Sequence, residues 1–388
     1  MVLKDLKLIF DNSHCTFFSG QTVSGRLVVE LDAPEYLSSI LVKFRGEANC
    51  SWSETNTIRR NGNDETQTTT YTDNDLYFEK HMTLFGGSGS TEMLPAGSHF
   101  FQFCMVVPNH LPSSFEGKYG HIRYTVKGIL DRPWTFSHEV MASFIVMSTL
   151  DLNLDPVNKV PVQLETTKHF CCFCCKSGPL TFVMHLPAKG YIPGQDIPIT
   201  VEIENGSNVK VCNVACELWK TVSYYCASPR GSKEESMVVA ELALDGPVAE
   251  NECKTWTVNM RIPPAPPSML NSCSIIDLTY RLMVKAVPKG LHRELIHCTS
   301  IIIGTVPLRQ SSCPQQALPT PTAPASEPVA AHMPLPTYEE CMHSAASAGS
   351  SDNSKHMPGT MGYNPRYPYY PLQGTEPDNP ATACSSFK

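Results

Sequence analysis

The stretch LPSSFEGKYGHIRYTVKGILDRPW, residues 111–134, decides the fold of this chain. It opens with a Pro-Ser-Ser turn, after which the apolar residues Ile122, Tyr124 and Val126 alternate with polar ones. Alternation with period 2 is typical of a strand with one face buried and the other in solvent. The stretch therefore predicts a turn followed by a half-buried β-strand.

The same pattern returns in residues 266–288, PPSMLNSCSIIDLTYRLMVKAVP, where Tyr280 aligns with Tyr124. Upstream of these segments, residues 18–30 and residues 192–202 match each other as well, each with a Gly-Gln turn before a strand. Matched segments that recur in the same order predict two copies of one β domain.

Composition supports an all-β chain without a basic surface. Hydrophobic residues make up 41% and charged residues 17% of the 388 residues, and no window shows a convincing helical stripe. We therefore expect two tandem immunoglobulin-like β-sandwiches. The formal net charge of -7 argues against nucleic acid as a partner.

The predicted organisation has four parts: a first β domain at residues 1–147, a linker at 148–163, a second β domain at 164–307 and a tail at 308–388. The tail contains thirteen prolines and four basic residues, so we expect it to be disordered. Residues 53–75 are rich in Thr, Asn and Asp, which predicts a long exposed hairpin or loop.

Neither a signal peptide nor a membrane span is expected. The N-terminus is charged at its fourth residue, and the best apolar run, at residues 301–306, is only as long as a strand. A cytoplasmic location follows, and the sixteen cysteines are expected to be reduced thiols.

The sequence contains none of the common catalytic motifs. A G-x-S-x-G elbow, a P-loop and an H-E-x-x-H zinc motif are all missing, and the carboxylates and histidines have no spacing suited to acid–base chemistry. We expect a protein that is not an enzyme and uses no cofactor or metal.

The densest thiol cluster comprises Cys171, Cys172, Cys174 and Cys175. Three interpretations stay open: small apolar residues at the start of a strand, a reversible acylation site, and a metal site. The metal interpretation needs further ligands, for which Cys212 and Cys216 are the candidates.

Two tail segments resemble ligands of WW domains, which bind proline-rich peptides of the form P-P-x-Y. The first is Leu335-Pro336-Thr337-Tyr338, and the second is Pro368-x-Tyr370. Two such segments would raise avidity. The alternative for the first is a chance match in a proline-rich tail. The alternative for the second is a run of aromatic residues that make weak contacts in a disordered tail.

The chain resembles the alpha-arrestins, also called arrestin domain-containing proteins. The residues that carry the resemblance are 113–117 (SSFEG), 120–127 (GHIRYTVK), 132–134 (RPW), 176–179 (KSGP), 189–194 (KGYIPG), 203–205 (IEN) and 303–307 (IGTVP). The resemblance implies two arrestin sandwiches and an adaptor role. Family members recruit WW-domain HECT-type ubiquitin ligases to the cytosolic regions of membrane receptors or transporters, for ubiquitination, endocytosis and endosomal sorting. It thereby also implies recruitment to the plasma membrane and endosomes.

Carried over to this chain, Pro336 and Tyr338 would contact the ligase, with Leu335 in place of the first proline. Two alternatives remain. The protein could sort cargo through its β domains without binding a ligase. It could also bind thioredoxin, because Cys253-Lys-Thr-Trp256 resembles the Cys-x-x-Trp segment of a family member whose cysteine forms a mixed disulfide with thioredoxin.

Overall fold

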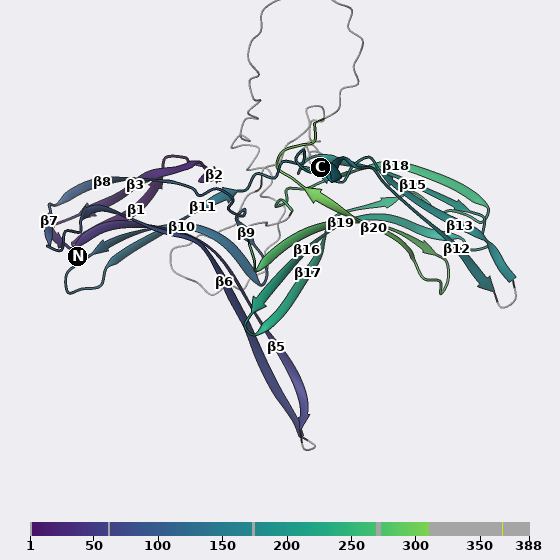
Figure 1. Cartoon of the computed structure of the whole chain (residues 1–388), viewed down its shortest axis with the longest axis horizontal. Helices are drawn as coiled ribbons and strands as arrows, with labels where there is room; N and C mark the ends of the chain where they lie inside the picture. Colours follow the sequence, from purple (N-terminus) through teal and green to yellow (C-terminus); the bar gives the residue numbers. More distant parts are fainter. Residues whose placement is uncertain (1, 61–62, 173–174, 269–272, 310–366, 368–388) are drawn as a thin grey trace, which may run out of the picture.

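The structure, a computed structural model, describes residues 2–60, 63–172, 175–268, 273–309 and 367. Two β domains lie side by side, and a long hairpin projects between them (Figure 1). No helix in these ranges is long and apolar enough to cross a membrane. The predicted all-β class with two tandem sandwiches is confirmed.

The N-terminal domain pairs two sheets, in the strand orders β1-β3-β8 and β2-β11-β10-β5-β6, with β9 beside β10 and a small β4-β7 pair. Phe44 of one sheet and Phe103 of the other pack edge to face, with ring centroids 5.8 Å apart. The strands are β1 (Leu3–Phe10), β2 (Thr16–Phe18), β3 (Thr22–Leu31), β4 (Glu35–Leu37), β5 (Ser39–Arg60), β6 (Asn63–Gly86), β7 (Glu92–Leu94), β8 (Gly97–Val106), β9 (Phe115–Glu116), β10 (Gly120–Asp131) and β11 (His138–Met147).

The C-terminal domain repeats this plan with sheets β12-β13-β15-β18 and β14-β20-β19-β16-β17. Phe182 and His297 join its two sheets, with ring centroids 4.3 Å apart. The strands are β12 (Val162–Cys172), β13 (Cys175–Leu186), β14 (Gly190–Tyr191), β15 (Asp196–Asn205), β16 (Val211–Ala227), β17 (Arg230–Leu244), β18 (Glu252–Arg261), β19 (Ile276–Pro288) and β20 (Leu295–Ile303).

The two predicted tyrosine strands are equivalent in the structure. Residues alternate along β10 between buried and half-buried, as predicted. Tyr124 Oη donates to Pro112 O (2.7 Å), and Tyr280 Oη donates to Pro266 O (2.8 Å). In each domain a fully buried phenol therefore satisfies a carbonyl of the Pro-Ser segment that precedes its strand.

The matched glycine turns are equivalent too. Gly20 and Gly194 have φ values of 86° and 87°, which a residue with a Cβ rarely adopts. Gly20 N donates to Val107 O (3.0 Å), and Gly194 N donates to Ile262 O (2.9 Å). The predicted duplication is confirmed at the level of individual hydrogen bonds.

The segment between β11 and β12 runs against the end of the C-terminal domain. It contains a short 3-10 helix, η1 (Pro156–Lys159), whose first turn is capped by Asp155. Leu150 N donates to Thr305 Oγ1 (2.7 Å), and Thr305 N donates back to Leu150 O (2.9 Å). These reciprocal bonds fix the connection to the segment that follows β20 at the end of the second domain.

The polar segment at residues 53–75 belongs to the hairpin of β5 and β6, which continues unbroken from the core of the N-terminal domain (Figure 1). Hydroxyls pair across it, Ser51 with Thr72 and Ser53 with Thr70, both at 3.1 Å. Threonine suits a pleated surface, so the strands persist without apolar alternation.

Candidate functional site: the seam between the two domains

The β5–β6 hairpin of the N-terminal domain meets the β16–β17 hairpin of the C-terminal domain at a seam (Figure 1). Lys233 Nζ lies 3.1 Å from Glu54 Oε1 and 6.0 Å from the centroid of the Tyr119 ring. Both members of this ion pair are about one third exposed, so the pair adds little stability and mainly sets the register of the hairpins.

Two carboxylates of β6 bind the opposite domain more specifically. Asp73 Oδ2 accepts a bond from Ala227 N (2.8 Å), and Asp75 Oδ2 accepts bonds from Ser274 N and Oγ (both 3.1 Å). Each carboxylate accepts from a backbone N–H of the other domain, at the end of β16 and just before β19. The polar sequence of the hairpin therefore has a structural role at the seam.

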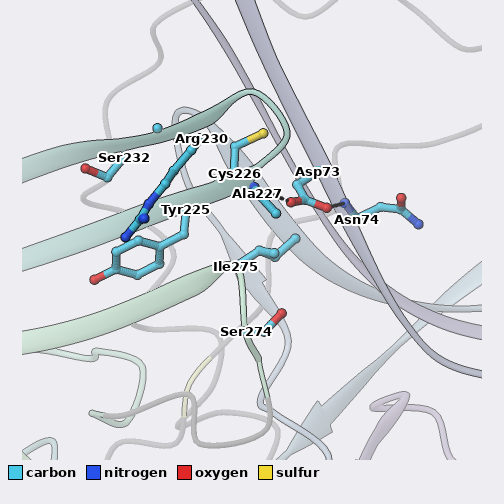
Figure 2. Close-up of a pocket in the computed structure, with 10 residues that line it drawn as sticks. Asp73, Asn74, Tyr225, Cys226, Ala227, Arg230, Ser232, Ser274 and Ile275 are labelled. Atoms are coloured by element: carbon cyan, nitrogen blue, oxygen red, sulfur yellow. Dashed lines mark hydrogen bonds between the residues drawn. The ribbon is translucent and has the colours of Figure 1, made fainter.

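A cleft of about 770 Å³ opens beside Asp73, which Figure 2 shows among the lining residues. Its volume is in the range of small-ligand sites, and its lining is about equally polar and apolar. The lining residues are Asp73, Asn74, Tyr225, Cys226, Ala227, Arg230, Gly231, Ser232, Ser274 and Ile275. They include donors such as Arg230 and acceptors such as Asp73, which can form hydrogen bonds with a polar ligand.

Two thiols, one from each domain, contact a backbone carbonyl of the other domain across the seam. Cys50 Sγ contacts Tyr225 O at 3.3 Å, and Cys226 Sγ contacts Thr72 O at 3.5 Å. Burial raises the pKa of the Cys50 thiol to about 11, so it stays protonated at neutral pH and acts as a weak donor. Neither cysteine belongs to a sequence motif, so neither could be predicted as a seam residue from the sequence.

Glycines allow the domains to approach closely. A Cβ on Gly117 would lie 2.1 Å from Tyr224 Oη, and a Cβ on Gly231 would lie 2.4 Å from Tyr71 Cε1. Each glycine belongs to one domain and each tyrosine to the other. At these two points, a tyrosine ring of one domain therefore packs directly against the backbone of the other.

The predicted docking residues Leu335, Pro336, Thr337, Tyr338, Pro368 and Tyr370 lie outside the described residues. Leu308, Arg309 and Tyr367 are the described residues of the tail, and Tyr367 Oη donates to Ser114 O (3.1 Å). The tail thus contacts the N-terminal domain immediately before the second predicted docking sequence.

The predicted cysteine sites lie away from the seam. Cys253 is exposed on β18, the edge strand of its sheet. Cys171, Cys172 and Cys175 lie where β12 and β13 meet, and Cys174 is outside the described residues. Cys212, a candidate further ligand, is exposed, whereas Cys216 is buried. Across the described ranges, no group of three or more His, Cys, Asp or Glu residues could hold a metal.

Comparison with known proteins identifies both domains. The N-terminal domain of the family described as arrestin (or S-antigen) matches residues 6–153, and its C-terminal domain matches residues 176–308. Arrestin domain-containing protein 4 of Mus musculus is 30% identical over 312 residues, 79% of this chain and 72% of its own length.

Two further relatives extend the match. Arrestin domain-containing protein 17 of Caenorhabditis elegans is 29% identical over 309 residues, which cover 79% of this chain and 71% of the relative. Arrestin domain-containing protein 1 of Homo sapiens is 26% identical over 376 residues, which cover 96% of this chain and 81% of the relative.

Proposed function

Since the chain belongs to the arrestin domain-containing proteins, we propose that it is a non-enzymatic adaptor that links membrane cargo to WW-domain HECT-type ubiquitin ligases. The cargo is the cytosolic part of a receptor or transporter. The adaptor works in the cytoplasm, at the plasma membrane and on endosomes, where it promotes ubiquitination, endocytosis and sorting.

The observation that carries this proposal is the combination of two complete arrestin domains with the tail sequence Leu335-Pro336-Thr337-Tyr338. Pro336 and Tyr338 supply the proline and the aromatic anchor that a WW groove binds. The cleft at the seam offers hydrogen-bonding groups to a ligand and so supports a binding role as well.

Titration of the full chain with isolated WW domains of a HECT-type ligase tests whether the chain binds the ligase. Tyr338→Ala should abolish binding, because the anchor that fills the groove is lost. Tyr370→Ala measures any contribution of the second sequence, and Tyr363→Ala is the matched control. If the wild-type chain does not bind, direct ligase recruitment is wrong, and sorting of cargo through the β domains alone takes its place.

Exposure of Cys253 favours a second candidate function, thioredoxin binding through a mixed disulfide. A thioredoxin that lacks its resolving cysteine should then capture the wild-type chain but not Cys253→Ser. Cys298→Ser, at another exposed thiol, is the control. Equal capture of both variants would exclude Cys253 as the site, and Tyr338→Ala should leave capture unchanged.

A further inference from the structure

Ser114 presents a buried carbonyl at the seam that Tyr367 satisfies. The serine is fully buried, its N–H donates to Val146 O (2.8 Å), and its Oγ accepts from Val146 N (3.0 Å). These bonds fix the segment against β11 and leave the Ser114 carbonyl to accept from Tyr367 Oη at 3.1 Å. A buried carbonyl gains most from a donor, so the tyrosine completes the hydrogen bonding of this residue.

The C-terminal domain shows that this segment is a rigid element. Ser268 makes the same pair of bonds with Ile303: its N–H donates to Ile303 O, and its Oγ accepts from Ile303 N, both at 2.8 Å. Because both copies of the Pro-Ser segment are fixed by their own domain, the site beside Ser114 needs little reorganisation to accept a side chain.

Tyr367 also lies near the second domain. Tyr280 is 1% exposed, and burial together with the neighbouring Tyr367 phenol holds its pKa well above the usual value. Tyr280 Oη is already bonded to Pro266 O, so it neighbours Tyr367 rather than competing for Ser114. The half-buried Tyr367 side chain is therefore placed between the N-terminal and C-terminal domains.

We propose that the seam beside Ser114 is a binding site for the tyrosine side chain of a proline-flanked peptide, and that Tyr367 of this chain occupies it. Pro365 and Pro368 restrict the backbone on both sides of the tyrosine, which lowers the entropy lost on binding. The tether of residues 310–366 makes the contact intramolecular, so a weak intrinsic affinity is enough to fill the site.

Occupancy of this site regulates the second docking sequence. Pro368 and Tyr370 follow Tyr367 directly, so a WW domain that binds them must compete with the seam. This consequence rests on the proposed ligase docking, whereas the seam site itself does not.

Limited trypsin digestion of the native full chain tests the site, because two cleavable tail bonds provide an internal reference. The Arg366–Tyr367 bond lies at the anchor, and the Lys355–His356 bond lies eleven residues upstream. We expect Tyr367→Phe to speed cleavage after Arg366 about fivefold, the effect of one lost hydrogen bond, with no change after Lys355. Tyr363→Phe should change neither rate, and in denaturant all variants should be cleaved alike.

Equal native cleavage after Arg366 in the wild type and in Tyr367→Phe would overturn the hydrogen-bonded site. Photo-crosslinking supplies an independent readout: a benzophenone amino acid at position 367 of the full chain should crosslink to residues 111–116, and the same group at 363 should not. Crosslinks from 367 that miss this segment would also overturn the proposal. Failure of WW binding would leave both results intact, so the two proposals fail separately.

Discussion

Gly117 of the N-terminal domain packs so closely on Tyr224 of the C-terminal domain that a Cβ on the glycine would lie 2.1 Å from Tyr224 Oη. Gly117→Ala should therefore force the domains apart or displace Tyr224, at a cost of about 1 to 3 kcal/mol. Denaturant unfolding measures the cost, and small-angle scattering measures the separation. Tyr224→Phe removes the clashing oxygen and should recover part of the loss; additive effects of the two changes would contradict this contact.

The carboxylates of β6 should act as seam anchors. Asp73→Ala combined with Asp75→Ala removes the acceptors for Ala227 N, Ser274 N and Ser274 Oγ, so the angle between the domains should become more variable. Small-angle scattering of the double variant should show a broader distance distribution. Asp64→Ala, at an exposed carboxylate of the same strand, is the control, and an equal effect there would rule out a specific anchor.

The two equivalent tyrosines should each stabilise their own domain. Tyr124→Phe leaves Pro112 O without its donor, and Tyr280→Phe does the same to Pro266 O. Each change should lower the free energy of unfolding by about 1 to 3 kcal/mol, the cost of an unsatisfied buried carbonyl. Hydrogen exchange should locate each effect in the domain that carries the mutation; exchange that rises equally in both domains would contradict this independence.

Stability should fall between pH 6.5 and about 4 because of His121. Burial, with Arg123 nearby, lowers the pKa of His121 to about 4, so the folded state keeps it neutral where the unfolded chain is protonated. The unfolded state then binds more protons, and the folded state loses about 1 to 2 kcal/mol across this range, a figure reduced for partial exposure. His121→Gln should flatten the pH profile, while His185→Gln, at an exposed position, should not. A profile unchanged by His121→Gln would exclude this residue as the cause.

The sequence predicted strands and turns within each domain but none of the contacts between the domains. The same tyrosine and the same glycine occur in both domains, as Tyr124 and Tyr280 and as Gly20 and Gly194. They recur because each domain needs a donor to the same carbonyl and the same turn conformation. The sequence predicted residues 53–75 only as a hairpin or loop, since a polar strand pair lacks the apolar period that identifies a buried face.

The seam residues could not be predicted for a different reason. Asp73 bonds Ala227 across 154 positions, and Cys50 contacts Tyr225 across 175. No local period or motif encodes contacts between residues so far apart. Tyr367 lies just before the second predicted docking sequence, and its bond to Ser114 becomes visible only in three dimensions.

The hairpin of β5 and β6 links the angle between the domains to a remote point. The outermost contact with the second domain described above is at Glu54, six residues before β5 ends at Arg60, which places that end about 20 Å beyond the contact. A rotation of about 10° between the domains that carried the hairpin along would move its end by about 3.5 Å relative to that contact. A small change in the angle between the domains at the seam would therefore become a larger displacement at the end of the hairpin, the point farthest from both cores.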